Sequence, residues 1–297
     1  MQAQRTHHIK IIFGGNKMVD FKNITIGCIG CGTMGGSLIR AMAGSCNKNN
    51  IFVSAKHTER AESFAKECGV VAVKTNKEVA TKAQYIFLAV KPAYVKEVIA
   101  EIKDSFNEKT VVVSMAAGVT LQALHNACGD TPLSNSVKTV PHFIRIMPNL
   151  PATVGEAMTA LTPADDVSAD DIATVTALLS TAGKVEQVAE KLMDGVTAVS
   201  GSGPAYAFLF IEALADAAVK FGIPRKQAYV YAAQTLKGAA TMALTDGRSI
   251  SELKDAVCSP AGTTIEGVIS LERHGFRSAV IEAATAAFNK SVELGKK

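Results

Sequence analysis

Apolar residues in the first two thirds of the chain alternate between short unbroken runs and stretches where they recur every three or four residues. Unbroken runs predict buried strands, and the three-to-four spacing predicts helices. We predict strands at Ile24–Ile29, Ile51–Ser54, Val70–Val73, Tyr85–Val90, Thr110–Ser114, Phe143–Met147, Ala157–Leu161 and Val185–Val188. The helices predicted between them are Met34–Ala43, Glu59–Cys68, Asn76–Lys82, Val95–Ile102 and Leu121–Ala127. This alternation predicts an α/β domain with a doubly wound, mostly parallel sheet.

From about residue 190 onwards the pattern is helical only. The predicted helices are Leu192–Ser200, Pro204–Phe221, Arg225–Leu244, Ser249–Ala256, Thr263–His274 and Phe276–Leu294. The most apolar stretch, Ala205–Ala218, includes two acids and is predicted to be a buried helix. We therefore expect residues 1–17 to be an extension outside the fold, 18–188 to be the α/β domain and 189–297 to be an all-α domain.

Charge and composition exclude several classes of function. The 297 residues contain 31 Lys and Arg against 27 Asp and Glu, a net charge of +4 that is scattered along the chain. Nucleic-acid and membrane-surface binding are therefore not expected. No apolar run reaches the roughly 18 residues of a transmembrane helix, and the first residues lack the pattern of a signal peptide.

The six cysteines do not form a metal or disulfide pattern. Cys28 and Cys31 have C-x-x-C spacing, but the first falls in a predicted strand and the second in a glycine turn. No second pair has ligand spacing, so we predict small buried side chains and no metal site. Free cysteines without a signal peptide favour the cytoplasm.

A glycine motif follows the first predicted strand. Gly30, Gly32 and Gly35 give G-x-G-x-x-G between that strand and the next helix. In this context the glycines serve the tight turn, the approach of a pyrophosphate and helix–strand packing, and the helix N-terminus attracts the anion. The motif predicts a Rossmann domain that binds a dinucleotide.

The end of the second strand bears on the choice of cofactor. An acid there would bind the ribose 2′-hydroxyl of NAD and repel a 2′-phosphate. This chain has Ser54, Lys56, His57 and Arg60 in that region instead. The residues favour NADP(H) and leave NAD(H) as the alternative, and Lys56 and Arg60 are equally compatible with solvated charges.

Three further loops are expected at the carboxyl ends of strands, where ligands of such sheets bind. They are Ala89–Pro92, Ser114–Gly118 and Arg145–Pro151. In the last of these, the amide of Asn149 suits either a cofactor carboxamide or an Asx turn between two prolines.

The helical domain has its own candidate site at Asp255–Thr264. Backbone N–H groups of Gly262, Thr263 and Thr264 at a helix start can hold a small carboxylate, with the Thr264 hydroxyl left for a second group. The alternative is a structural cap in which Ser259 is the N-cap and Pro260 the first helical residue.

These motifs together resemble those of pyrroline-5-carboxylate reductases, from about Ile24 to the C-terminus. The resemblance is carried by Ile29–Met34, Leu88–Pro92, Ser114–Gly118, Arg145–Asn149, Val199–Tyr206, Asp255–Thr264 and Leu271–Ser278. It implies a Rossmann domain, a helical domain that interlocks with a second subunit, and dimers that often assemble into decamers. Cys28 and Cys31 depart mildly from the family pattern.

The resemblance implies NAD(P)H-dependent reduction of 1-pyrroline-5-carboxylate to L-proline, the last step of proline biosynthesis. Residues expected to contact the cofactor are Ile29, Gly30, Cys31, Gly32, Thr33, Met34, Gly35, Ser54, Lys56, Asn76, Ala89, Val90, Lys91, Pro92, Met115, Ala116, Ala117 and Asn149. Residues expected to contact the substrate are Val257, Ser259, Gly262, Thr263 and Thr264, of which Thr264 orients the imine and is the catalytic candidate.

Two other functions fit the two-domain plan. A β-hydroxyacid dehydrogenase would carry a proton-donating lysine after its G-x-G motif, but Ala207 stands at that position after Gly201 and Gly203. A non-catalytic nucleotide sensor would need an output module such as a basic recognition helix, and the sequence contains none that we recognise.

Overall fold

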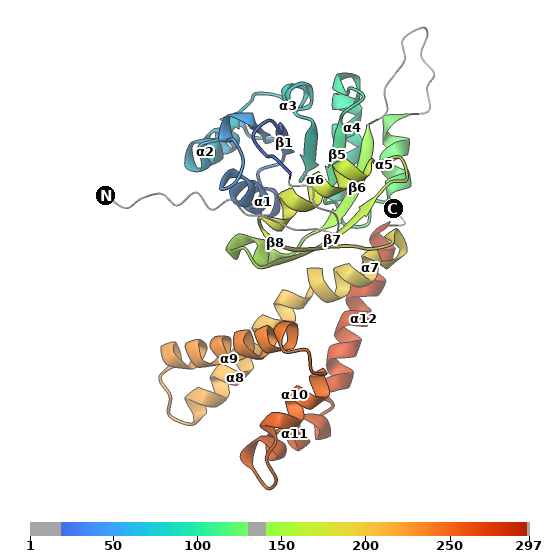
Figure 1. Ribbon diagram of the computed structural model, residues 1–297. Coiled ribbons are helices and arrows are strands. Elements are labelled where there is room, and N and C mark those ends of the chain that lie inside the picture. Colours follow the sequence, from blue (N-terminus) through green and yellow to red (C-terminus); the bar gives the residue numbers. More distant parts are fainter. Residues whose placement is uncertain (1–18, 130–140, 296–297) are drawn as a thin grey trace, which may run out of the picture. The chain divides into compact units, whose positions relative to one another are not determined.

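The structure is a computed structural model that describes residues 19–129 and 141–295 (Figure 1). The predicted extension 1–17 lies outside the described residues. The chain divides into two compact units: one runs to Gly201 and resumes at Phe288, and the other is Ser202–Ala287. Residues 189–201 thus group with the sheet-containing unit by their contacts, whereas the domain boundary expected near residue 188 stays a prediction.

The first unit contains a single eight-stranded sheet among the described residues. Its strands are β1 (Ile26–Ile29), β2 (Ile51–Ser54), β3 (Val71–Ala72), β4 (Tyr85–Leu88), β5 (Val111–Ser114), β6 (His142–Met147), β7 (Ala157–Pro163) and β8 (Gly183–Gln187). Their order is β3-β2-β1-β4-β5-β6-β7-β8, and only β6 and β7 pair antiparallel. Because the chain order reverses at β1, the carboxyl end of β1 is the switch point at which open α/β sheets bind ligands.

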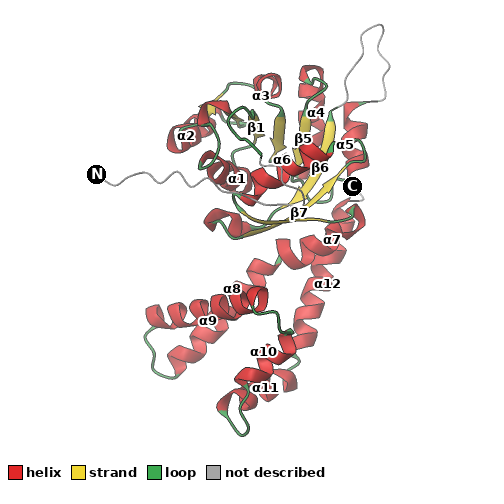
Figure 2. Ribbon diagram, in the orientation of Figure 1, coloured by secondary structure: helices red, strands yellow, loops and turns green. Residues whose placement is uncertain are grey.

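Helices cover both faces of this sheet (Figure 2). They are α1 (Thr33–Ala43), α2 (Thr58–Cys68), α3 (Asn76–Lys82), α4 (Val95–Ile102), α5 (Leu121–Cys128) and α6 (Ala169–Ser180). Along β4, Tyr85 and Phe87 join the buried cluster that includes α1 and α6, whereas Ile86 and Leu88 join the cluster that includes α3, α4 and α5. Burial of both faces explains why this strand is an unbroken apolar run, and the predicted α/β fold is confirmed.

Two details of this unit differ from the prediction, and one goes beyond it. Helix α6 was not foreseen, whereas the antiparallel pairing of β6 with β7 agrees with a mostly parallel sheet and identifies its one exception among the described strands. The expected helix Leu192–Ser200 is a 3₁₀ turn at Glu190–Leu192, a short α7 (Met193–Val196) and a π-helical turn at Thr197–Gly201. The backbone carbonyl of Ser200 in that turn accepts a hydrogen bond from Asn149 at 3.1 Å, a tertiary contact that sequence periodicity does not encode.

The remaining helices are α8 (Gly203–Lys220), α9 (Arg225–Thr245), α10 (Ile250–Val257), α11 (Thr263–Arg273) and α12 (Phe276–Gly295), the last of which ends in the first unit. Helices α8 and α9 pack through Ala215, Ala228 and Ala232, the buried cluster of this unit. The prediction that α8 is buried is wrong for the single chain, because Phe208 is 58% and Leu209 67% exposed. Small residues bring the two helices together, and the large apolar side chains remain uncovered.

Candidate functional site

The glycine loop at the carboxyl end of β1 has the geometry that the motif predicts. Gly30 has a φ of +105°, and a Cβ there would lie 2.6 Å from the carbonyl oxygen of Ala89. A Cβ on Gly35 would lie 2.4 Å from the carbonyl oxygen of Gly30. The backbone N–H of Gly30 donates to the carbonyl of Ser54 at 2.9 Å, which ties the loop to the end of β2. Both glycines are therefore required by packing within the protein, Gly30 against Ala89 at the end of β4 and Gly35 against Gly30.

Gly32 is different, because packing within the chain does not require it. A Cβ on Gly32 would have no contact within 4 Å beyond its chain neighbours among the described residues. Gly32 is the N-cap of α1, and no side chain caps this helix. An uncapped helix start beside open space offers backbone N–H groups and the positive end of the helix dipole to an anion.

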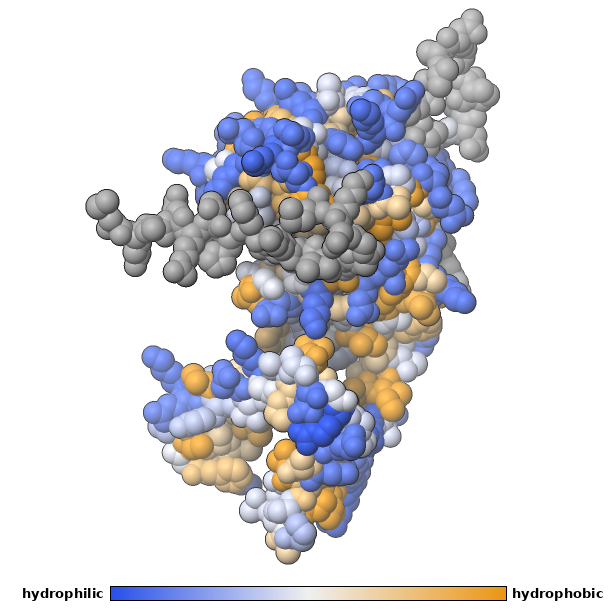
Figure 3. Space-filling model, viewed as in Figure 1, coloured by the Kyte–Doolittle hydropathy of each residue, from blue (hydrophilic) through white to orange (hydrophobic). Residues whose placement is uncertain are grey.

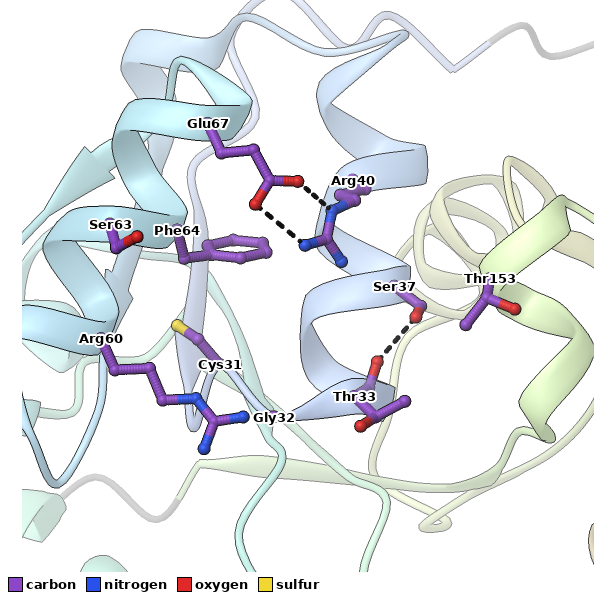
Figure 4. A pocket seen from close by; sticks show the side chains of 10 residues that line it. All are labelled: Cys31, Gly32, Thr33, Ser37, Arg40, Arg60, Ser63, Phe64, Glu67 and Thr153. Atoms are coloured by element: carbon purple, nitrogen blue, oxygen red, sulfur yellow. Dashed lines mark hydrogen bonds and ion pairs between the residues drawn. The ribbon is translucent and has the colours of Figure 1, made fainter.

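Next to Gly32 lies a hollow of about 440 Å³ (Figure 4). It is lined by Cys31, Gly32, Thr33, Ser37, Arg40, Arg60, Ser63, Phe64, Glu67 and Thr153. Arg40 is held by Glu67, with Nε and Nη2 donating to the two carboxylate oxygens at 3.0 and 3.2 Å. Arg60 instead extends towards Cys31 and Gly32 (Figure 4), so its cation faces the side of the hollow at which the glycine loop lies.

The end of β2 carries a hydrogen-bonded chain of three side chains. The Ser54 hydroxyl donates to Oδ1 of Asn76 at 2.8 Å, and Nδ2 of Asn76 donates to Oε2 of Glu101 at 2.7 Å. Ser54 itself is 1% exposed. A direct contact between Ser54 and a cofactor therefore requires Asn76 to move, and Asn76 is the more accessible of the two. Nearby, Nζ of Lys56 lies 5.7 Å from the centroid of the Tyr94 ring.

The other expected loops follow β4, β5 and β6. The N–H of Ala89 donates to the carbonyl of Ile29 at 2.9 Å, and the N–H of Met115 donates to the carbonyl of Leu88 at 3.2 Å. Residues of the Ala89–Pro92 and Met115–Ala117 loops therefore lie along one edge of the sheet with the glycine loop, as parallel strands require.

Asn149 fits neither of its two sequence interpretations well. Its Oδ1 accepts from the N–H of Met158 at 3.0 Å, and its Nδ2 donates to the carbonyl of Ser200 at 3.1 Å. The amide thus joins β7 to the π-helical turn, which is neither an Asx turn nor a free cofactor ligand. A cofactor contact by Asn149 stays a prediction that would have to share these bonds.

The candidate substrate loop joins α10 to α11. Val257 ends α10, and α11 begins at Thr263 with Gly262 as its N-cap and without a side-chain cap. The alternative with Ser259 as N-cap and Pro260 as first helical residue is wrong, because residues 259–262 form a turn in which the N–H of Gly262 donates to the carbonyl of Ser259 at 3.0 Å. That bond occupies the Gly262 N–H and leaves Thr263 and Thr264 as the uncapped helix start.

The cysteines are all free, and both members of the C-x-x-C are buried. Burial raises the pKa of the Cys28 thiol well above its ordinary value, and burial raises that of Cys31 to about 11 despite the opposing effect of Arg60. Thiols with raised pKa values are poor nucleophiles and poor metal ligands at neutral pH.

Sequence reasoning missed two acidic side chains that accept hydrogen bonds from residues far away in the chain. Glu101 belongs to a helix whose apolar face alone is visible in the pattern. Glu190 accepts from the buried Arg145 guanidinium at 3.2 Å and from the N–H of Leu121 at 2.7 Å. Neither acid has a local motif, so only the tertiary contacts reveal them.

Two family models match this chain, one in each half. A family model described as pyrroline-5-carboxylate reductase dimerisation matches residues 190–294. A second, described as NADP oxidoreductase coenzyme F420-dependent, matches residues 25–118.

Full-length relatives agree with this division. Pyrroline-5-carboxylate reductase of Escherichia coli is 44% identical over 273 residues, which cover 91% of this chain and 98% of the relative. The enzyme of Corynebacterium melassecola is 40% identical, with 92% and 99% covered.

Solved structures show the same likeness. A pyrroline-5-carboxylate reductase from Coxiella burnetii has a TM-score of 0.83 and 34% identity, covering 92% of this chain and 99% of that chain. Plasmodium falciparum pyrroline carboxylate reductase with NADP bound has a TM-score of 0.80 and 31% identity, covering 93% and 100%. The chain belongs to the pyrroline-5-carboxylate reductase family.

Proposed function

We propose that this protein reduces 1-pyrroline-5-carboxylate to L-proline with NAD(P)H, the last step of proline biosynthesis. The observation that carries the proposal is the match to reductases of this name along nearly the whole of both chains. Neither a 3-hydroxy acid dehydrogenase nor a nucleotide sensor has comparable support, and the lysine of the former is replaced by Ala207.

The cofactor is expected on the edge of the sheet at the end of β1. Gly32 to Gly35 would hold the pyrophosphate, and the lack of contacts among the described residues at the Cβ position of Gly32 fits this group. Lys56, Arg60 and Asn76 would face the adenosine ribose. The Ala89–Pro92 and Met115–Ala117 loops would flank the nicotinamide. The bound cofactor supplies a hydride from its dihydronicotinamide ring, and the NADP in the Plasmodium falciparum structure supports NADP(H) as the form used.

The substrate is expected at the start of α11. N–H groups of Thr263 and Thr264 would bind its carboxylate, and Val257 and Ser259 would line the site. The Thr264 hydroxyl would hydrogen-bond the ring nitrogen and so orient the imine. A protonated C=N bond is already electrophilic, so the reaction needs orientation and electrostatic stabilisation more than a strong side-chain acid.

The helical unit would form a homodimer, and dimers would assemble further into a decamer. Large apolar side chains lie exposed on this unit, several of them visible as orange patches in Figure 3. They are Phe208, Leu209, Leu214, Phe221, Tyr229, Val230, Tyr231, Met242, Leu244, Ile250, Val257, Ile269, Leu271, Phe276, Val280 and Ile281. So many exposed large apolar side chains on one unit support an interaction surface there.

One helical stretch of the described residues, Glu190–Lys220, is also long and apolar enough to span a membrane, and 11% of its apolar 18-residue window is buried in the single chain. Coverage by a second subunit accounts for its composition equally well, and Glu212 and Asp216 within it favour that explanation. The cytoplasm is the proposed location, in keeping with six free cysteines.

The test is oxidation of NADPH and NADH by the pure protein with and without 1-pyrroline-5-carboxylate. We expect substrate-dependent oxidation, with proline as the product. Absence of that reaction together with turnover of a 3-hydroxy acid would contradict the proposal.

A further inference from the structure

The polar group presented at the end of β2 is an amide and not the serine that the sequence suggests. Ser54 is the last residue of β2, the position from which a side chain meets the adenosine ribose 2′-oxygen in this fold. Its hydroxyl is 1% exposed and donates to Oδ1 of Asn76. Asn76, the first residue of α3, accepts this bond and is the more exposed of the two side chains at the strand end.

Glu101 determines which way this amide faces. An amide side chain has two orientations that differ in the exchange of oxygen and nitrogen. A carboxylate only accepts hydrogen bonds, so Glu101 permits only the orientation with Nδ2 towards it, at 2.7 Å. Oδ1 is then directed at the Ser54 hydroxyl, which donates to it at 2.8 Å. The two bonds are mutually consistent only in this orientation.

An amide nitrogen carries two hydrogens, and Glu101 uses one of them. We propose that Glu101 is a positioning residue for the cofactor, holding Asn76 so that its second Nδ2 hydrogen is available to the 2′-oxygen or 2′-phosphate of the adenosine ribose. This inference rests on the proposed function, because it takes the dinucleotide to lie at this edge. In the opposite orientation the Oδ1 lone pairs would oppose a phosphate.

The arrangement also explains how an acid can stand near the strand end without excluding NADP. An acid that contacts the ribose directly accepts from the 2′-hydroxyl and repels a 2′-phosphate. Glu101 instead accepts a hydrogen bond from Nδ2 of Asn76, and the same Nδ2 presents its other hydrogen to the ribose. A donor suits both the 2′-hydroxyl oxygen and the 2′-phosphate.

The experiment measures NADPH binding by fluorescence titration without the imine, so that it does not depend on turnover. The proteins compared are the wild type, Glu101→Ala, Glu101→Gln, Asn76→Ala and the double variant Asn76→Ala/Glu101→Ala. We expect Glu101→Ala to weaken binding by about five- to tenfold, the scale of one ordinary hydrogen bond. Glu101→Gln, whose amide oxygen still accepts, should stay within about threefold of the wild type. The double variant should bind no more weakly than Asn76→Ala alone.

Steady-state kinetics and thermal unfolding distinguish a role of Glu101 in positioning Asn76 from a role in stability. In Glu101→Ala the KM for NADPH should rise while kcat stays unchanged, and the thermal midpoint should change little because Glu101 is exposed. Glu108→Ala is the matched control: Glu108 is an exposed acid that precedes β5, at the opposite edge of the sheet. It should bind NADPH like the wild type.

Three results would overturn the inference. One is wild-type affinity in Glu101→Ala, and another is a loss in the double variant equal to the product of the two single losses. The third is an equal loss in Glu108→Ala, which would reveal a general effect of charge. If Asn76→Ala itself binds NADPH normally, the proposed place of the cofactor fails as well, whereas a loss in Asn76→Ala but not in Glu101→Ala refutes only the role of Glu101.

Discussion

Replacing Gly32 by alanine should separate cofactor binding from folding. Gly32 has φ −76° and ψ −171°, which alanine adopts without strain, and within the described part of the chain the new methyl group has no contact within 4 Å beyond its chain neighbours. Alanine is a poorer N-cap than glycine by up to about 1 kcal/mol. It also lowers the conformational entropy of the unfolded chain, which stabilises the folded protein by about 0.4–1 kcal/mol. The free energy of unfolding should therefore change by less than about 1 kcal/mol.

The same methyl group occupies the space at the start of α1 that the pyrophosphate is expected to enter. We expect Gly32→Ala to raise the Kd for NADPH at least about tenfold, or about 1.4 kcal/mol. The assay is fluorescence titration with NADPH on protein whose thermal unfolding has been recorded under the same conditions.

Gly35→Ala is the matched comparison, because its methyl group meets protein instead of open space. The Cβ would lie 2.4 Å from the carbonyl oxygen of Gly30 and 2.5 Å from Cβ of Ala89. Neither neighbour is the flexible end of a side chain, so we expect a loss of about 1–3 kcal/mol or more in stability. Normal NADPH affinity in a stable Gly32→Ala protein would refute the proposed pyrophosphate site. Equal destabilisation by both variants would refute the distinction between the two glycines.

Four further predictions follow from the other sites. Thr264→Ala should lower kcat/KM for the imine by roughly ten- to a hundredfold without changing NADPH affinity, and Thr264→Ser should retain most activity; near-native kinetics in both would remove Thr264 from the mechanism. The wild type should have at least a dimeric mass in solution at micromolar concentration, and Leu209→Glu should shift it towards a monomer; a monomeric wild type would contradict the assembly. Glu190→Ala leaves the buried Arg145 guanidinium without the carboxylate it donates to and should lower the free energy of unfolding by roughly 2–4 kcal/mol, measured by chemical denaturation; Glu190→Gln should restore part of it. Because burial raises the pKa of Cys31 from 9.0 to about 11, the stabilisation by its neutral thiol is complete below pH 9 and is lost as the pH rises through 11; Cys31→Ser should flatten the fall of stability over that interval, and an unchanged slope would argue against it.

The sheet was predictable because its strands are buried on both faces. The strand at Tyr85–Leu88 is an unbroken apolar run, and its side chains enter the two clusters on opposite faces alternately. The antiparallel pairing of β6 with β7 was not predictable, because a buried strand shows the same run whichever way its neighbour points. The sequence likewise contains the apolar residues of α8, but cannot tell whether the same chain or a second one covers them.

Some residues of the candidate site were likewise predictable from a local motif, and others depend on contacts between distant parts of the chain. The glycine loop was predictable because its three glycines form a local motif between a strand and a helix, even though Gly30 and Gly35 pack against Ala89 from the end of another strand. Ser54 was expected to contact the cofactor because it ends a strand, but in the fold its side chain is buried and hydrogen-bonded to Asn76. Glu101, which fixes that amide, lies 25 residues from Asn76 in the chain. Functional groups that act through hydrogen bonds between distant segments have no local motif, so the polarity of the strand end can be derived only from the folded chain.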